Sequence, residues 1–272
     1  MAKIVPDTTI REVGTVPAQD VWPPNVVAVG SGGGGGDDLQ EFVNRIDVSV
    51  NKARVDNAQS MSPVLTTQTG TNLAGAYNGG GLGNKAILGI QGFDLMPLSM
   101  LSSIVWVWRE MEIAHTNPIA FEVYVNVIIE PDPVGNPGVF KIISIANNNG
   151  PPIVCAAATS LGNGRWNYAW ASAPPVLPSG PNIVQVVNDF GPPFPVIPPD
   201  ISFGPTWPAH AYFMSTILAA FPNARLRDAS SLDGGLPKLT VTPAILFVVG
   251  DSNNVSLVSR LIETIVVNGV SV

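Results

Sequence analysis

Two acidic side chains, Glu110 and Glu112, have the spacing in this sequence that comes closest to a catalytic pair. Alternate side chains of an extended strand project from one face, so the two carboxylates would lie side by side, preceded on that face by Trp106 and Trp108. An aromatic platform beside two acids suits the cleavage of a sugar, because most glycosidases place a pair of carboxylates at the scissile bond. The segment EMEIAH continues to His115 rather than to a third acid, which favours a solvent-facing strand end.

A second set of residues suits the binding of a glycan rather than its cleavage. Trp166, Tyr168 and Trp170 alternate in NGRWNYAW, so three rings would share one face. Alternating aromatic residues are also typical of the buried face of a strand, and we favour that interpretation.

Oxygen-bearing side chains gather in the segment EPDPVGNPG. Glu130, Asp132 and Asn136 are the candidate calcium ligands there, although Asp, Asn and Gly are also the ordinary residues of tight turns. No segment has a clear metal-ligand spacing, so we expect no cofactor, with calcium as the alternative. Cys155 is the single cysteine, and its apolar flanks predict a buried side chain rather than a nucleophile.

The elements that must position these residues are predicted to be β-strands. The chain has 27 Gly and 26 Pro, and short β-branched or alternating runs lie between these turn formers. The two strongest strands, 102–113 and 119–129, are separated by Asn117 and Pro118, which predict an antiparallel hairpin. Helical spacing is found only in the segment 210–228, where Pro222 is predicted to stop the helix. Further strands are predicted at 42–50, 138–146, 182–190, 238–250 and 261–272.

Residues 37–272 are predicted to form a single β-sandwich domain with a proline-rich excursion at 174–208. Four aromatic residues in the excursion would be costly to leave in water, so we expect it to lie on the sandwich surface. They are Phe190, Phe194, Phe203 and Trp207.

The order of elements over residues 40–272 resembles the concanavalin A-like jelly rolls: a first strand, a long central pair, a short helix after a long loop, and a final strand in ETIVVNGV. The resemblance implies an all-β, jelly-roll-like antiparallel β-sandwich with one short helix and an extended N-terminal arm. Lectins, laminarinase-like glycoside hydrolases and virion proteins share that architecture. The segment EMEIAH resembles the E-x-D-x-x-E strand of the laminarinase-like enzymes, but Glu112 replaces the central Asp and His115 the last acid.

Composition separates the functional classes. Hydrophobic residues make up 46% of the chain and charged residues only 12%, which suits a subunit whose surface is covered by neighbouring copies. A formal net charge of -7 disfavours nucleic acid as a partner, because no basic patch is available to neutralise phosphates. The N-terminus lacks the continuous apolar core of a secretory signal, and the apolar runs are too short to cross a bilayer, so we expect neither a Sec signal nor membrane insertion.

The N-terminal segment 1–36 is predicted to be an arm with a glycine hinge. We expect the arm to pair with an open sheet edge of a neighbouring copy, or to fold back on its own sandwich. The hinge comprises Gly32, Gly33, Gly34, Gly35 and Gly36, and the apolar arm residues are Ile10, Val13, Val16, Val26, Val27 and Val29.

The sequence therefore favours a structural, self-assembling protein without catalytic activity. We expect a virion subunit of the capsid, decoration or tail type, or a surface-filament subunit, located in a virion or an extracellular surface assembly. The alternative is a carbohydrate-binding, lectin-like module with glycans as partners, and the third hypothesis is a laminarinase-like hydrolase.

Overall fold

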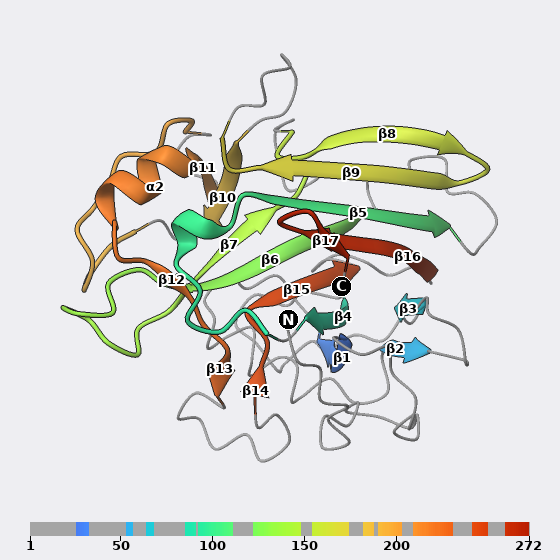
Figure 1. Cartoon of the computed structure of the whole chain (residues 1–272), viewed down its shortest axis with the longest axis horizontal. Coiled ribbons are helices and arrows are strands. Elements are labelled where there is room, and N and C mark those ends of the chain that lie inside the picture. Colours follow the sequence, from blue (N-terminus) through green and yellow to red (C-terminus); the bar gives the residue numbers. More distant parts are fainter. Residues whose placement is uncertain are drawn as a thin grey trace, which may run out of the picture.

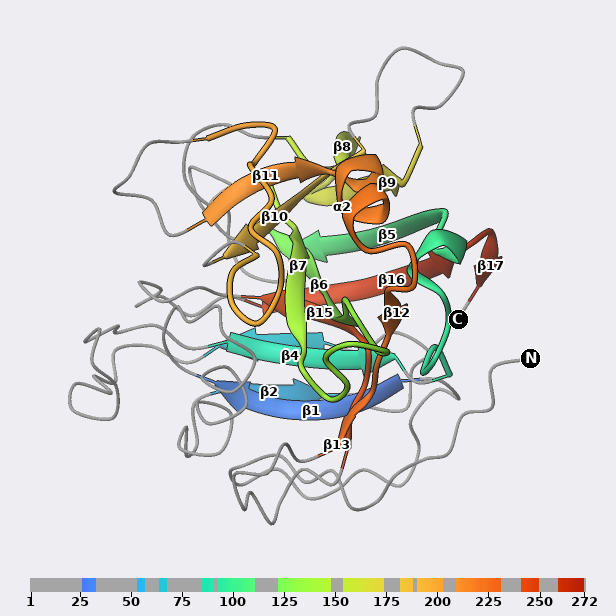
Figure 2. The same ribbon diagram turned by 90° about the vertical axis from the view of Figure 1, so that its left-hand side faces the viewer.

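The computed structural model describes residues 26–32, 53–56, 64–67, 85–90, 92–110, 122–147, 154–173, 182–187, 190–202, 209–230, 241–249 and 259–271. These residues form two antiparallel β-sheets, together with one α-helix near one end (Figure 1). The predicted all-β sandwich is therefore confirmed. Figure 2 shows β1 and β2 at the bottom of the two sheets and β8 and β11 at the top.

The first sheet has the central strand β6 (Val123–Glu130), whose last two residues also pair with the short β12 (Arg225–Leu226). The order of its main path is β1 (Val26–Gly32), β4 (Lys85–Ile90), β15 (Ile245–Val249), β6, β7 (Lys141–Ile145), β10 (Ile183–Val187) and β11 (Ala209–Phe213).

The second sheet is ordered β2 (Ala53–Asp56), β3 (Val64–Thr67), β16 (Ser259–Val267), β5 (Ser103–Glu110), β9 (Arg165–Ala171) and β8 (Ala157–Gly162), with β17 (Val270–Ser271) added to β16. A separate ribbon is formed by β13 (Ala229–Ser230) and β14 (Val241–Thr242). The helical elements are the 3₁₀ turn η1 (Leu98–Met100) and the helix α2 (Met214–Ala220).

The two strongest predicted strands form, but they do not pair with each other. β5 lies between β16 and β9 in the second sheet, whereas β6 lies between β15 and β7 in the first, so the predicted hairpin is wrong. Their apolar faces instead meet across the sandwich, where Trp106 Nε1 donates a hydrogen bond to the backbone oxygen of Val123 at 2.8 Å. Alternation shows that a strand has an apolar face, but it does not distinguish a neighbour in the sheet from one across the core.

The core between the sheets is rich in aromatic rings. Trp106 is fully buried and stacks on Tyr168 of the adjacent strand, with ring centres 5.3 Å apart, and it meets Phe247 of the opposite sheet edge-on at 6.1 Å. β5 alternates between buried and partly exposed residues, as a strand with one covered face should. β6 is buried along its whole length, because it is central in its sheet and covered on both faces.

Two hairpin turns have the Asn-Gly sequence. Asn163 and Gly164 join β8 to β9 with φ values of 52° and 70°, and Asn268 and Gly269 join β16 to β17 with 52° and 77°. Both central residues of a type I′ turn need positive φ, which Asn and Gly adopt most easily. The Asn268 side chain also accepts a hydrogen bond from the Ser102 backbone N–H at 2.8 Å, so this turn holds the start of β5.

The predicted helix at 210–228 is shorter than expected, because the structure forms α2 only over Met214–Ala220. The preceding residues belong to β11, in which Tyr212 is fully buried, and the following residues form β12. Strand pairing therefore outweighs helical propensity on both sides of α2. In the described part of the chain, no helix is long and apolar enough to span a bilayer.

Within the proline-rich excursion 174–208, the structure describes 182–187, which contain β10, and 190–202, whose two phenylalanines lie on the sandwich. Phe190 and Phe194 are buried, and both rings contact Phe221 just after α2, with ring centres 4.8 and 5.8 Å apart respectively. Phe203 and Trp207 lie outside the described residues, as does the predicted strand 42–50.

Candidate functional site

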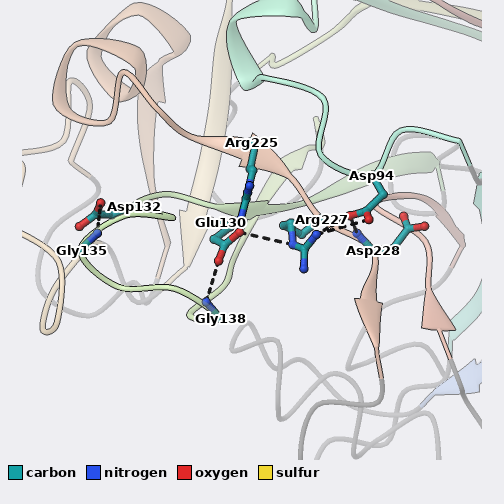
Figure 3. Close-up of polar contacts among 8 residues, drawn as sticks. All are labelled: Asp94, Glu130, Asp132, Gly135, Gly138, Arg225, Arg227 and Asp228. Carbon is teal, nitrogen blue, oxygen red and sulfur yellow. Dashed lines mark hydrogen bonds and ion pairs between the residues drawn. The ribbon is translucent and has the colours of Figure 1, made fainter.

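A group of charged side chains centred on Glu130 lies where β6 ends (Figure 3). Glu130 is only 2% exposed. One of its oxygens accepts a hydrogen bond from Arg225 Nε at 2.7 Å and lies 3.4 Å from Arg227 Nε, and the other accepts the backbone N–H of Gly138 at 2.6 Å. The carboxylate therefore joins β12 to the loop between β6 and β7.

Local sequence explains why these groups meet. Arg225 and Glu130 are cross-strand partners in the pairing of β12 with β6, so their side chains emerge on one face. Arg227 follows two residues later, and its side chain also reaches Glu130 (Figure 3). Burial alone would raise the pKa of Glu130, but the hydrogen bonds from Gly138 and Arg225 and the charges of both arginines hold it below its ordinary value.

Arg227 also connects this group to two aspartates. Its Nη1 donates to Asp94 at 3.1 Å, and Asp94 accepts the backbone N–H of Asp228 at 2.9 Å (Figure 3). Asp228 in turn accepts the backbone N–H of Ala244, just before β15, at 2.8 Å. Burial raises the pKa of Asp228 to about 6, and the negative charge of Asp94 adds to this rise. The hydrogen bond from Ala244 and the positive charge of Arg227 act in the opposite direction.

A carboxyl group that titrates near pH 6 beside a second carboxylate is a pattern used in acid-base catalysis. Here both aspartates are engaged by backbone N–H groups, and a shallow cleft of about 210 Å³ opens elsewhere, beside Asp132, Phe221 and Asn223. Asp228 does not line that cleft. The network therefore cross-links segments at the end of the sandwich, and its geometry does not present the two acids to a substrate in that cleft.

The three calcium candidates are held by hydrogen bonds of the loop itself. Glu130 is occupied by the two arginines and Gly138, whereas Asp132 accepts the Gly135 N–H at 2.9 Å and the Asn136 side-chain amide at 2.8 Å. These two hydrogen bonds hold the pKa of Asp132 below its ordinary value. In the ranges that the structure describes, no three His, Cys, Asp or Glu side chains come together as a metal site. The loop is ordered by its own turn chemistry.

The proposed catalytic pair is only partly described. Glu110 ends β5 and is partly exposed, and Glu112 lies outside the described residues. Trp106 and Trp108 do not form a solvent-facing platform, because both are fully buried. The guanidinium carbon of Arg260, the cross-strand partner of Glu110, lies 5.1 Å from the Trp108 ring centre. These indoles contribute to the core and are not accessible to a sugar.

The three glycan candidates follow the alternative that the sequence favoured. Trp166, Tyr168 and Trp170 all lie on β9 with their side chains toward the core; Tyr168 is 3% and Trp170 1% exposed, and Trp166 is partly buried and packs on the core edge. This burial corrects their assignment as a glycan platform, because a sugar can stack only on a ring face that solvent reaches. Cys155 is buried as predicted, and burial raises the pKa of its thiol to about 12.

The predicted arm enters the structure as β1. Val26, Val27 and Val29 lie on this strand, and β1 pairs antiparallel with β4 of the same chain, from Val26 opposite Ile90 to Gly32 opposite Lys85. Gly32, the first hinge glycine, is the last residue of β1. The other hinge and arm residues lie outside the described residues: Ile10, Val13, Val16, Gly33, Gly34, Gly35 and Gly36.

The upper edges of the two sheets differ. In the first sheet, the edge strand β11 is covered by the excursion: Ile201 and Ala211 exchange two backbone hydrogen bonds of 3.0 Å, and Asp200 accepts the N–H of Phe213 at 2.8 Å. In the second sheet, the edge strand β8 pairs with β9 on one side only among the described residues, and five of its six residues are exposed.

The charged network at the end of β6 was not predicted, although part of its signal is in the sequence. Arg225 and Arg227 alternate in RLRD, which is a strand pattern, but this segment follows the stop at Pro222 and was not assigned to a strand. Asp94 comes from a distant loop that sequence spacing does not relate to β12. The sequence put Glu130 and Asp132 in one turn segment as candidate metal ligands, whereas in the structure Glu130 ends β6, Asp132 lies in the loop that follows, and both accept hydrogen bonds from within the protein.

Comparison of the chain with models of known families, with characterised proteins and with solved structures found no match.

Proposed function

We propose that this protein is a structural subunit that assembles with copies of itself by exchanging its N-terminal strand. The observation that carries the proposal is the position of β1. It is the terminal strand of the first sheet, and in that sheet it pairs with β4 alone. Such a strand can leave its own sandwich without disturbing the pairing of the strands behind it.

The contact that β1 makes is transferable to a neighbouring copy. Backbone hydrogen bonds and register are the same whether the strand comes from its own chain or from another, so exchange costs little beyond opening the hinge. Glycines follow the strand directly in the sequence, and glycine gives a chain the conformational freedom that a hinge requires. The edge of β4 is a suitable acceptor because its backbone N–H and C=O groups on that side pair with β1 and need a strand as partner.

The composition supports assembly independently of β1. Only 12% of residues are charged, and the described surface shows large apolar side chains such as Val154, Val196 and Met100, which are 51%, 75% and 60% exposed. A subunit that meets several neighbours can keep such residues, whereas an isolated protein relies on charge to stay dispersed. A virion or surface-filament component is the class of assembly that these features fit best.

Engineered cysteines test where β1 pairs. Ser31 and Ala86 are cross-strand partners in β1 and β4, so cysteines at both positions, in a Cys155→Ala background, can form a disulfide. Strand exchange predicts covalent oligomers on a non-reducing gel. The matched control is the pair Val266→Cys and Ser271→Cys, which are partners in the β16–β17 hairpin and join within one chain.

The outcome that contradicts the proposal is a disulfide at Ser31→Cys and Ala86→Cys that forms only within single chains, at every protein concentration. Each single-cysteine variant shows the background of random coupling. The control pair must give monomers only, because a two-residue turn leaves no length for exchange.

A further inference from the structure

We propose that β8 is a second self-association site, at which two copies of this chain pair their β8 strands antiparallel and join their second sheets edge to edge. This inference rests on the proposed function, since it concerns how the same subunit assembles, but it depends on a different part of the molecule. β8 lies at the edge opposite β2, away from β1 and β4 (Figures 1 and 2).

The backbone of β8 has pairing capacity left on its outer side. A strand with one neighbour uses half of its N–H and C=O groups in the ladder and leaves the other half along its edge. β11, the corresponding edge of the first sheet, shows how this fold closes an edge, through Ile201 and Asp200. No equivalent segment covers β8 within the described ranges.

The sequence of β8 lacks the features that keep edge strands apart. AATSLG contains no charged residue and no proline, and the residues from Ala158 to Gly162 are exposed. Natural edges usually carry a lysine, a proline or a bulge that prevents pairing. The only such feature here is the bulge between Ser160 and Gly162, which leaves a regular stretch from Ala157 to Ser160.

The absence of charge indicates a second copy as the occupant. In a two-fold antiparallel pair of the regular stretch Ala157–Ser160, the axis passes beside Ala158 and Thr159, so a charge at either position would lie next to the same charge of the other copy. A strand of Ala, Thr and Ser meets no such repulsion, and Thr opposite Ala or Thr is a compatible cross-strand pair. An open sheet edge accepts an exposed, extended strand, and β8 of a second copy is such a strand.

A charge-pair experiment on the full chain tests the proposal. Thr159 lies in the regular stretch and is exposed, so Thr159→Lys and Thr159→Glu should both fold, which circular dichroism checks. We expect each variant alone to lose the β8 contact, so that the species joined through it falls to half its mass in sedimentation. An equimolar mixture of the two variants should restore the mass, because position 159 lies beside the axis and a lysine of one copy is then adjacent to a glutamate of the other. Ser215→Lys, on the exposed side of α2, is the matched control and should leave the mass unchanged.

Two outcomes overturn the proposal. If Thr159→Lys has the mass of the parent protein, β8 is not an interface; if both variants lose mass and the mixture does not recover it, β8 pairs with something other than itself. A parallel variant lacking residues 1–36 separates this proposal from the proposed function. If the deletion loses mass and Thr159→Lys does not, the exchanged arm is supported and the β8 contact is refuted. If Thr159→Lys loses mass and the deletion does not, the β8 contact is supported and the exchanged arm is refuted.

Discussion

Replacing Asp228 with asparagine separates the charge of this side chain from its hydrogen bond. Asparagine keeps an oxygen that can accept the Ala244 N–H, now found at 2.8 Å, but it carries no charge into the partly buried site. In the folded protein burial raises the pKa of Asp228 from 3.8 to about 6, with the charge of Asp94 adding to the effect. A raised carboxyl pKa means that folding disfavours the ionised form.

The size and the pH dependence of the effect follow from these two pKa values. Below pH 3.8 the carboxyl is protonated in both states and costs nothing; between pH 3.8 and about 6 the unfolded state ionises first, so the wild type loses stability as pH rises. Each pKa unit corresponds to about 1.4 kcal/mol, which gives an upper limit of about 3 kcal/mol. Solvent screens this partly exposed group, so we expect a gain of about 1 kcal/mol for Asp228→Asn at neutral pH.

The assay is urea unfolding of wild type and Asp228→Asn from pH 4 to pH 8 at one protein concentration. The variant should be the more stable above pH 6, and the difference should shrink toward zero at pH 4. Asp200→Asn is the control, because Asp200 also accepts a backbone N–H, that of Phe213 at 2.8 Å, but is exposed. A variant that is less stable than wild type at pH 7, or a difference that does not depend on pH, would refute the assignment of a charge cost to this site.

Three further substitutions test other parts of the structure. Glu130→Gln should lower the free energy of unfolding, measured in urea at pH 7, by about 3 kcal/mol, because it leaves two arginines near a neutral group. This loss should shrink in acid, because the wild-type carboxylate, whose pKa is lowered, is then protonated as well. Trp106→Phe should cost about 2 kcal/mol by the same measurement, through loss of the 2.8 Å bond between the sheets, and no loss would mean that this bond contributes nothing. Gly269→Ala should lower the free energy of unfolding by about 1 kcal/mol, because alanine is strained at a φ of 77°. Gly164→Ala should lower it further, because the added carbon would also lie 3.3 Å from Glu110. Equal melting temperatures for the two variants would contradict the role of that contact.

The sequence predicts six of the longer strands, because alternation and turn residues are local signals. β5, β7, β10 and β15 fall within the predicted runs, whereas β6 ends one residue after its predicted run and β16 begins two residues before its own. Which sheet each strand joins is a non-local property, and the hairpin prediction failed for that reason: the same apolar face fits a partner across the core as well as one beside it. The Asn163-Gly164 turn is different, since its dipeptide is a strong local hairpin signal that agrees with the favoured placement of the three aromatic residues on a strand.

The candidate sites show the same division. The sequence identified Glu130 and Asp132 as polar residues of one turn segment, but it did not identify the partners of Glu130, because Arg225 and Arg227 reach it from a distant segment. The aromatic residues chosen as binding groups are buried, since large rings are worth more to a sandwich core than to its surface. Spacing along a strand gives the face of a side chain, and only the packing of the sheets decides whether that face meets solvent.

The mass of the protein in solution tests the central claim most directly. Sedimentation equilibrium at matched concentrations compares the mass of the full chain with that of the chain lacking residues 1–36, which has no β1. Exchange of β1 between copies predicts an oligomer for the full chain and a smaller species for the deletion. Equal masses for the two, with both folded by circular dichroism, would contradict an assembly built on the N-terminal strand.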